Sequence, residues 1–380
     1  MATQPGPGAA AHDDAEIRAL LRRSLETALA RHYGFEQRRD AHATPAGHSA
    51  AAWAAYAEIG LLALTLPEAH GGLPGSLADI AMAAELMGGV LALEPYRATM
   101  VAARLLAAAG TPEQQAAWLP RLADGSARAA LAHEEGAGRL DAPIATQAVR
   151  DGNGWRLSGR KAVVAGGDAA DIFIVSARVD DAIGLFLVPA EQAVRRAYRC
   201  FDWTGAADLM FADITLPGDA KLAGGAGALA RALDEATALA CADAVGAMRA
   251  ASRLTRDYAC TRRQFGVPIV SFQVLQHRLV DMAIAVEMAA PITAAAIAAC
   301  ETADDPARIR AVSAAKVKAD ESARYIGQQC VQIHGGMGLT QEYPAAHFFA
   351  RLGLFERAWG DSDEHLQRFA SALSSRESLD

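Results

Sequence analysis

The stretch YACTRRQFGVPI, residues 258–269, is the point from which the fold of this sequence can be worked out. A helical pattern ends there in two arginines, a glycine and a proline supply a turn, and a second helical pattern begins at Phe272. Cations at a helix C-terminus complement its dipole by about 0.3–1 kcal/mol, so a basic helix cap is the simpler interpretation. An arginine pair offered to a phosphate is the alternative, because the planar guanidinium suits that ligand. Either way, the stretch predicts two long helices joined by a short basic turn.

Helical periodicity continues on both sides of this turn. Long helices are expected over residues 228–262, 272–302 and 306–333, and Gly335-Gly336 should end the last of them. Apolar spacing from residue 16 to residue 130 is also helical, with Thr111-Pro112 as an N-cap followed by a first-turn proline. Helical regions are therefore predicted at both ends of the chain.

The segment between residues 131 and 222 has the period of two that is typical of strands. Short β-type runs are separated by turns such as the one at 151–154, and no helix-length pattern is interleaved. An antiparallel barrel or sandwich therefore fits better than a parallel nucleotide-binding sheet. We predict an α+β chain with an N-terminal helical domain (1–130), a middle antiparallel β-barrel domain (131–223) and a C-terminal four-helix-bundle domain (224–380).

Composition excludes several classes of protein. Lys plus Arg number 36 against 44 Asp plus Glu, and the net charge of −8 argues against a nucleic-acid partner. The five cysteines form no CxxC pair, which favours reduced thiols over disulfides or a metal site. Residues 1–14 look like a frayed tail without the apolar run of a signal peptide, and the most apolar stretch, 291–300, is half a membrane span. We expect a cytoplasmic protein with no membrane insertion.

A second glycine-rich motif, QIHGGMG, covers residues 332–338 and is followed by LTQEYP. Three glycines in four positions permit positive φ angles and a close approach of the backbone to a ligand. The motif follows a predicted helix and not a strand, so it is a poor phosphate fingerprint, and a helix stop explains it equally well.

Together the two motifs resemble the acyl-CoA dehydrogenase family, whose patterns RxQFGxPI…FQ and QxxGGxGxTxEYP both occur here in the family's order. The resemblance covers nearly the whole chain, because the family also has the helical, β, helical order. It implies an oligomer, typically a dimer of dimers, with FAD held at a subunit interface. The residues that it assigns to the pyrophosphate and ADP portions of FAD are Arg262, Phe265, Gln273, Gln332, Gly335 and Gly336.

The resemblance also implies a reaction, the α,β-desaturation of an acyl-CoA thioester. A carboxylate removes the α-proton while a hydride passes from the β-carbon to flavin, and an electron-transfer flavoprotein-type acceptor reoxidises the flavin. Such a carboxylate needs a dry pocket in which its basicity rises. The family's usual glutamate is absent, because its position is occupied by Trp359.

Three other carboxylates are candidates for the base. A minority of the family carries the base on the helix before RxQFG, where this chain has an alanine; Glu235 is one residue away and rotated by about 100°. Asp243 lies on almost the same face as that alanine, about 10.5 Å further along an apolar helix. A salt bridge to an arginine such as Arg249 or Arg278 is the alternative for Asp243. Asp361 is the third candidate.

Departures in the middle domain leave the assembly and the chemistry open. Residues 163–165 (VVA) replace the aromatic strand that covers the flavin, and 132–139 (AHEEGAGR) replaces the family's Thr-Glu-Pro stretch. These features resemble the bacterial pimeloyl-CoA dehydrogenase small-subunit branch, some members of which form hetero-oligomers with a larger homologue. The chain could therefore be a catalytically weak partner subunit that completes an FAD site, or a flavin monooxygenase or nitroalkane-oxidising relative. His133, His334 and His365 are interpreted as structural, because each lacks a paired group.

Overall fold

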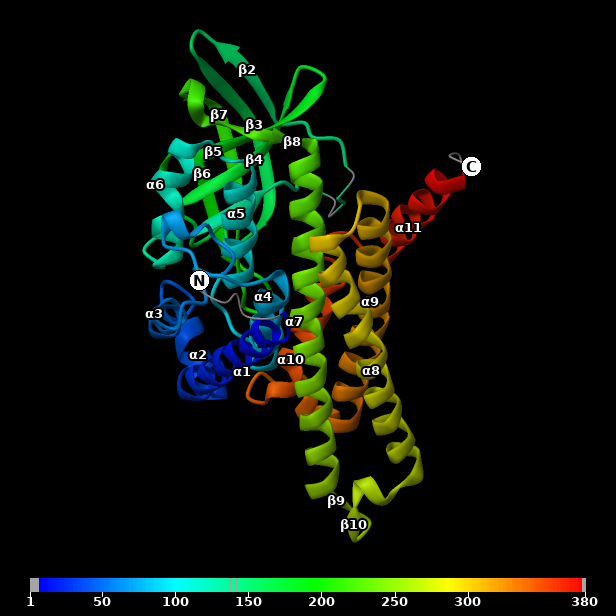
Figure 1. The fold of residues 1–380 in the computed structure, drawn as a ribbon. Helices are drawn as coiled ribbons and strands as arrows, with labels where there is room; N and C mark the ends of the chain where they lie inside the picture. Colours follow the sequence, from blue (N-terminus) through cyan, green and yellow to red (C-terminus); the bar gives the residue numbers. More distant parts are fainter. Residues whose placement is uncertain (1–6, 137–138, 141, 378–380) are drawn as a thin grey trace.

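Helices, a β-sheet and a long helical bundle follow one another along the chain in the computed structural model, which describes residues 7–136, 139–140 and 142–377 (Figure 1). The N-terminal helices are α1 (Pro7–His32), α2 (Phe35–Ala43), α3 (Ala50–Glu58), α4 (Leu77–Gly89), α5 (Tyr96–Ala109) and α6 (Pro112–Ala123). The side chain of Thr111 caps α6 as predicted, accepting the backbone N–H of Gln114. Helix α1 begins at Pro7, so the prediction of a frayed tail over 1–14 is wrong from that residue onward, and residues 1–6 lie outside the described part.

The middle of the chain forms one eight-stranded sheet in the order β6-β7-β3-β2-β4-β5-β8, with β1 paired to β4. Its strands are β1 (Ala129–Ala132), β2 (Gln147–Asp151), β3 (Gly154–Ala165), β4 (Ile172–Val179), β5 (Ala182–Pro189), β6 (Val194–Arg199), β7 (Gly205–Leu216) and β8 (Lys221–Gly225). Most pairs are antiparallel as predicted, but β4 runs parallel to both β1 and β2. Parallel neighbours need a long connection, and the β2–β3 hairpin, which lies between β1 and β4 in the chain, provides it.

The C-terminal region is a bundle of long helices. Its elements are α7 (Ala226–Thr261), β9 (Arg263–Gln264), β10 (Val267–Pro268), α8 (Gln273–Thr302), α9 (Asp305–His334), α10 (Pro344–Phe355) and α11 (Ser362–Glu377). The three predicted long helices are confirmed to within two residues at each end. Gly335 ends α9 with a φ of 62°, a conformation that favours glycine. Because α7 runs from beside the sheet to the β9–β10 turn, it connects the two ends of the molecule (Figure 1).

Glycines bring α4 and α7 into backbone contact. A Cβ added at Gly246 would lie 1.8 Å from the carbonyl oxygen of Glu85, and one added at Gly88 would lie 2.0 Å from that of Asp243. The apolar core that joins the N-terminal helices to the bundle is rich in alanine. A separate apolar core is formed mainly by residues of the sheet. This close packing fixes the part of α7 that carries Asp243.

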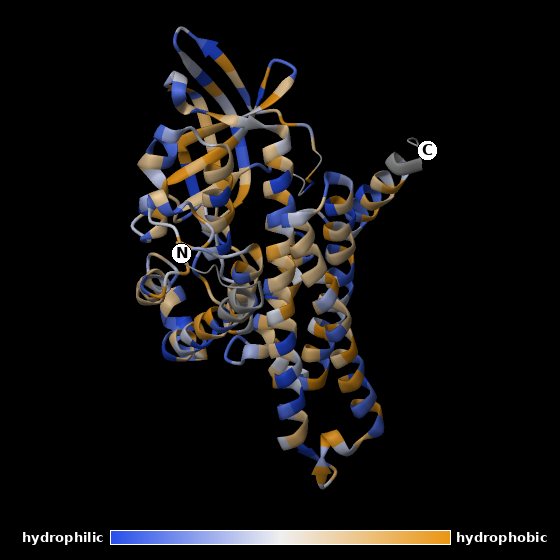
Figure 2. Ribbon diagram, in the orientation of Figure 1, coloured by the Kyte–Doolittle hydropathy of each residue, from blue (hydrophilic) through white to orange (hydrophobic). Residues whose placement is uncertain are grey.

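Helix α8 carries apolar residues on an exposed face. Val274, Val280, Ile284 and Met288 are all exposed, and apolar residues recur along α8 and at the β9–β10 turn (Figure 2). By length and composition alone, the whole of α8 is long and apolar enough to cross a membrane. The prediction from sequence rested only on residues 291–300, which are half the length of a span, and so underestimated the length of the apolar segment. In the fold α8 packs against α7 and α9, and 33% of its most apolar window is buried. All five cysteines are free.

Candidate functional site

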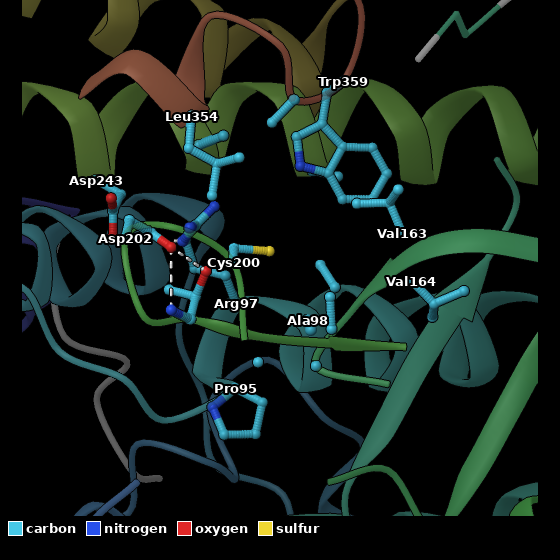
Figure 3. A pocket seen from close by; sticks show the side chains of 18 of the residues that line it. Pro95, Arg97, Ala98, Val163, Val164, Cys200, Asp202, Asp243, Leu354 and Trp359 are labelled. Carbon is cyan, nitrogen blue, oxygen red and sulfur yellow. Dashed lines mark hydrogen bonds and ion pairs between the residues drawn. The ribbon is translucent and has the colours of Figure 1, made fainter. Parts of the chain in front are cut away.

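A cavity of about 420 Å³ lies where the N-terminal helices, the sheet and the bundle meet (Figure 3). Its walls come from the start of α5, the loop after β1, the end of β3, the loop between β6 and β7, the middle of α7 and the segment between α10 and α11. The N-terminal helices, the sheet and the C-terminal bundle therefore all contribute to the cavity wall. The wall contains both apolar side chains, such as Val164 and Leu354, and charged ones.

A buried charge cluster forms one side of the cavity. The guanidinium of Arg351 lies 2.7 Å from Asp202 through Nε and donates from Nη1 to both oxygens of Asp243, at 3.1 and 3.2 Å. Arg97 approaches Asp243 from the cavity side, with Nε 3.4 Å from Oδ2. Burial alone would lower the pKa of Arg351, but the two carboxylates outweigh it and raise that pKa above its ordinary value. Arg351 therefore remains charged and holds both aspartates in place.

The three base candidates have different surroundings. Asp243 lines the cavity but is ion-paired, to Arg351 and Arg97 and not to Arg249 or Arg278 as the sequence suggested. Arg249 instead pairs with Glu85 and Glu287, and Arg278 bonds Gln329.

Glu235 is not among the residues lining the cavity, and it binds Arg104 through two bonds of 2.8 and 3.0 Å. Asp361 lines the cavity, is exposed to solvent and accepts the backbone N–H of Glu364 at 3.0 Å, which places it at the start of α11. The structure therefore brings two of the three candidates to one cavity.

Two departures from the family pattern lie beside each other at the cavity (Figure 3). Val163 sits in a bulge of β3, where the pairing with β7 shifts register, and has a φ of 50° although it is β-branched. The indole of Trp359, on the segment before α11, lies beside Val163 in Figure 3, and Trp359 also has a positive φ, 61°. The strand lacks an aromatic side chain here, and the indole of Trp359 lies next to that position. Strained residues of this kind concentrate at functional sites.

The loop after β1 is anchored to the sheet by a buried lysine. The ammonium group of Lys161 donates to the carbonyl of His133 at 3.0 Å, to Glu135 at 2.7 Å and to the hydroxyl of Ser176 at 3.1 Å. Burial lowers the pKa of Lys161 to about 8, against the opposing effect of Glu135.

Between these anchors, Glu134 lines the cavity, and burial together with the charge of Glu364 raises its pKa to about 7. We did not select Glu134 from the sequence. Its place in the AHEEGAGR stretch, where the family has a glutamate, was the one available signal.

The residues assigned to the dinucleotide lie at the other end of α7. Arg262 follows Asp243 by 19 residues, or about 28 Å of helix. The ring of Tyr258 packs on that of His334 with centroids 4.4 Å apart, which brings the two sequence motifs together. All six assigned residues, Arg262, Phe265, Gln273, Gln332, Gly335 and Gly336, are exposed.

The chemistry of this group fits the phosphate and adenosine portions of FAD. In the described part of the chain the side chain of Arg262 makes no hydrogen bond or ion pair, and Gln273 and Gln332 add amide donors. A Cβ built on Gly335 or Gly336 would meet nothing within 4 Å, so the space beside both glycines is open. Phe265 is 90% exposed and has a φ of 52°.

Comparisons with known proteins agree on one family. The model described as acyl-CoA dehydrogenase, N-terminal domain, matches residues 12–126, and that of the C-terminal domain matches 223–373. Acyl-CoA dehydrogenase FadE12 of Mycobacterium tuberculosis is 31% identical over 350 residues, covering 88% of this chain and 89% of FadE12.

Two similar solved structures are each named as a pair of different proteins. A glycine-to-alanine variant of the steroid ACAD Tcur3481-Tcur3483 has a TM-score of 0.88 at 31% identity, covering 96% of this chain and 99% of its own. The ChsE4-ChsE5 complex from Mycobacterium tuberculosis has a TM-score of 0.88 at 26% identity, covering 94% and 97%.

Proposed function

This chain belongs to the acyl-CoA dehydrogenase family and is therefore an FAD-dependent oxidoreductase, and we propose that it desaturates an acyl-CoA thioester between its α and β carbons. The observation that supports this most directly is the pairing, in one chain, of a carboxylate-lined cavity with an exposed set of dinucleotide-type donors. Bound FAD would supply the acceptor for the β-hydride.

The residues of the chain would divide the binding between them. Val163, at the bulge of β3, and the indole of Trp359 lie beside each other at the cavity, and together they would form a surface for the flat ring of the flavin. Arg262, Gln273 and Gln332 would hold the phosphate and adenosine end, contributed by a second subunit because they lie far along α7 from the cavity of their own protomer. We therefore propose that FAD binds at a subunit interface.

The cavity can also orient a thioester and exclude water from it. Asp243 is an anion fixed by two guanidinium groups, so we propose that it orients Arg97 toward the substrate. Asp361 is exposed to solvent and accepts the backbone N–H of Glu364 at the start of α11, so its carboxylate is already engaged as a helix cap. Glu235 is outside the cavity and bound to Arg104, where it would support α7 against α5. None of these three has the surroundings of a strong base.

A visible spectrum of the purified chain, followed by anaerobic addition of butyryl-, octanoyl- or glutaryl-CoA, tests the proposed reaction. We expect a flavin absorption band that bleaches with at least one thioester as the flavin is reduced. A flavin band that none of the three bleaches would contradict the proposed desaturation.

A second candidate function is that of a partner subunit in a hetero-oligomeric acyl-CoA dehydrogenase. The resemblance to the pimeloyl-CoA dehydrogenase small-subunit branch implies an assembly of this kind. Trp359 at the usual base position and the exposed apolar face of α8 both favour it, and two similar structures are named as pairs of chains. In that case the chain purified alone would be colourless and would gain flavin on co-expression with a larger homologue. For either function we propose a cytoplasmic enzyme that passes electrons to an electron-transfer flavoprotein-type acceptor.

A further inference from the structure

Among the described residues, six carboxylates line the cavity, and five of these are already engaged: Glu94, Asp168, Asp202, Asp243 and Asp361. Glu94 accepts hydrogen bonds from the hydroxyls of Tyr33 and Tyr56 and from the backbone N–H of Ser49. Such carboxylates are committed to holding the fold together, because breaking a buried pair leaves an uncompensated charge.

The remaining four engaged carboxylates bind cations or cap backbone groups. Asp168 pairs with Arg199, and Asp202 accepts from Thr204 and pairs with Arg351. Asp243 is held by two arginines, and Asp361 caps α11.

Glu134 is the sixth carboxylate, and it differs from the others. Across the described residues its side chain forms no hydrogen bond and no ion pair, and it is half-buried at the cavity wall. Its backbone is fixed, because its carbonyl accepts the N–H of Ala162 at 2.8 Å and its neighbours bind Lys161 on either side. The result is a fixed backbone that places at the cavity a carboxylate with no partner among residues 7–136, 139–140 and 142–377.

The position of Glu134 relative to α11 is the second observation. Glu364 is the charged residue that acts on Glu134, and it lies against Gly360, where an added Cβ would be 2.8 Å from its Oε2. Glu134 therefore shares the cavity with Trp359 and Asp361, and it lies close enough to Glu364, three residues further along the chain, to be affected by its charge. A carboxylate that is missing at Trp359 is thus supplied to the same cavity by the loop after β1.

We propose that Glu134 is the base that removes the α-proton, an inference that rests on the desaturation proposed above. In this step the Cα–H bond breaks and its proton moves to a carboxylate oxygen of Glu134. The electron pair left behind forms the Cα–Cβ double bond while the Cβ–H pair leaves as hydride to oxidised FAD. A base is most effective when its pKa is near the working pH, and the value of about 7 for Glu134 is consistent with this role.

The test is Glu134→Gln in the FAD-loaded protein, which keeps the shape of the side chain and removes its basicity. Two rates are measured with the thioester that bleaches the wild-type flavin fastest among butyryl-, octanoyl- and glutaryl-CoA. The first is anaerobic bleaching, and the second is exchange of the α-hydrogen with D2O, followed by mass spectrometry. We expect flavin content to stay at the wild-type level and both rates to fall by about 10²–10⁴-fold. Glu191→Gln, an exposed glutamate on the loop after β5, is the matched control and should keep wild-type rates.

Each other outcome decides against the inference in a distinguishable way. Wild-type rates in Glu134→Gln would overturn the role of Glu134 and leave the proposed desaturation intact. Loss of flavin from Glu134→Gln would assign the residue to the architecture of the cofactor site and not to proton transfer. A wild-type flavin that no thioester bleaches would overturn the proposed desaturation, and the role of Glu134 with it.

Discussion

Asp243 is the carboxylate that pairs with both Arg97 and Arg351 at the cavity. Replacing it with asparagine leaves Arg97 without its carboxylate and Arg351 with Asp202 alone. We expect Asp243→Asn to lower the free energy of unfolding by about 3 kcal/mol, the lower end for breaking a buried pair. Urea denaturation measures this loss, and Asp257→Asn, which breaks an exposed pair with Arg256, is the control that should cost well under 1 kcal/mol, as surface pairs do. If Asp243→Asn stayed folded but bleached flavin slowly and showed no α-hydrogen exchange, Asp243 would be the base.

His365 gives the fold a predictable response to acid. It is fully buried, with its two ring nitrogens near the hydroxyl of Ser313 and the carbonyl of Trp359, and burial lowers its pKa to about 4. Below about pH 6.5 His365 is protonated in the unfolded chain, whereas in the folded chain it stays neutral until about pH 4. The free energy of unfolding therefore falls as the pH is lowered from about 6.5 to about 4. The shift corresponds to about 3 kcal/mol at most.

Unfolding measurements from pH 7 to pH 4 on the wild type and on His365→Gln isolate this effect. Glu134 and Asp320 have raised pKa values, about 7 and about 6, so they act with the opposite sign in both proteins and cancel in the difference. Parallel curves for the two proteins would show that His365 does not titrate as its burial implies.

At the scale of elements, the contact between α4 and α7 depends on glycine at position 246. A Cβ there would press on the carbonyl of Glu85, which is backbone and cannot move aside without shifting the helix. We expect Gly246→Ala to destabilise the protein by about 3 kcal/mol, the upper part of the range for overpacking. Gly89→Ala is the matched control, because its Cβ would lie 3.6 Å from the nearest atom, an ordinary contact. Equal melting temperatures for the two variants would rule out backbone contact between these helices.

The elements that sequence could predict are those set by local signals. Local signals such as Arg262 after α7, and Pro306 and Gly335 at the two ends of α9, are visible in the sequence, and the bounds of all three long helices are confirmed to within two residues. Strand pairing depends on segments far apart, so the parallel pairing of β1 with β4 could not be obtained from a period of two. At the site, the apolar surroundings of Asp243 indicated a buried carboxylate, but its arginine partners come from α5 and α10. Glu134 could not be singled out from the sequence, because what distinguishes it is that its carboxylate has no hydrogen-bond or ion-pair partner among the described residues, which only the structure reveals.

At the scale of the whole molecule, the separation of the cavity from the dinucleotide motifs predicts complementation between defective subunits. Within one protomer about 28 Å of α7 separates Asp243 from Arg262, so a cofactor bound at the cavity would take its phosphate contacts from a neighbour. Arg262→Ala would then damage the site of the neighbour, whereas Glu134→Gln would damage the site of its own chain. Neither variant alone should desaturate an acyl-CoA.

Mixing these two variants distinguishes a shared site from a self-contained one. If the chain assembles with copies of itself, each mixed pair holds one cavity with a normal Glu134 that faces a normal Arg262, and that site is intact. We expect bleaching activity to return after the two variants are unfolded and refolded together, and not when they are refolded separately and then combined. Activity that stays absent after joint refolding would mean that Arg262 serves its own cavity, or that the neighbour is a different chain. Repeating the experiment with the co-expressed larger homologue separates these two cases, because Arg262→Ala would then lower flavin binding only in the mixed assembly.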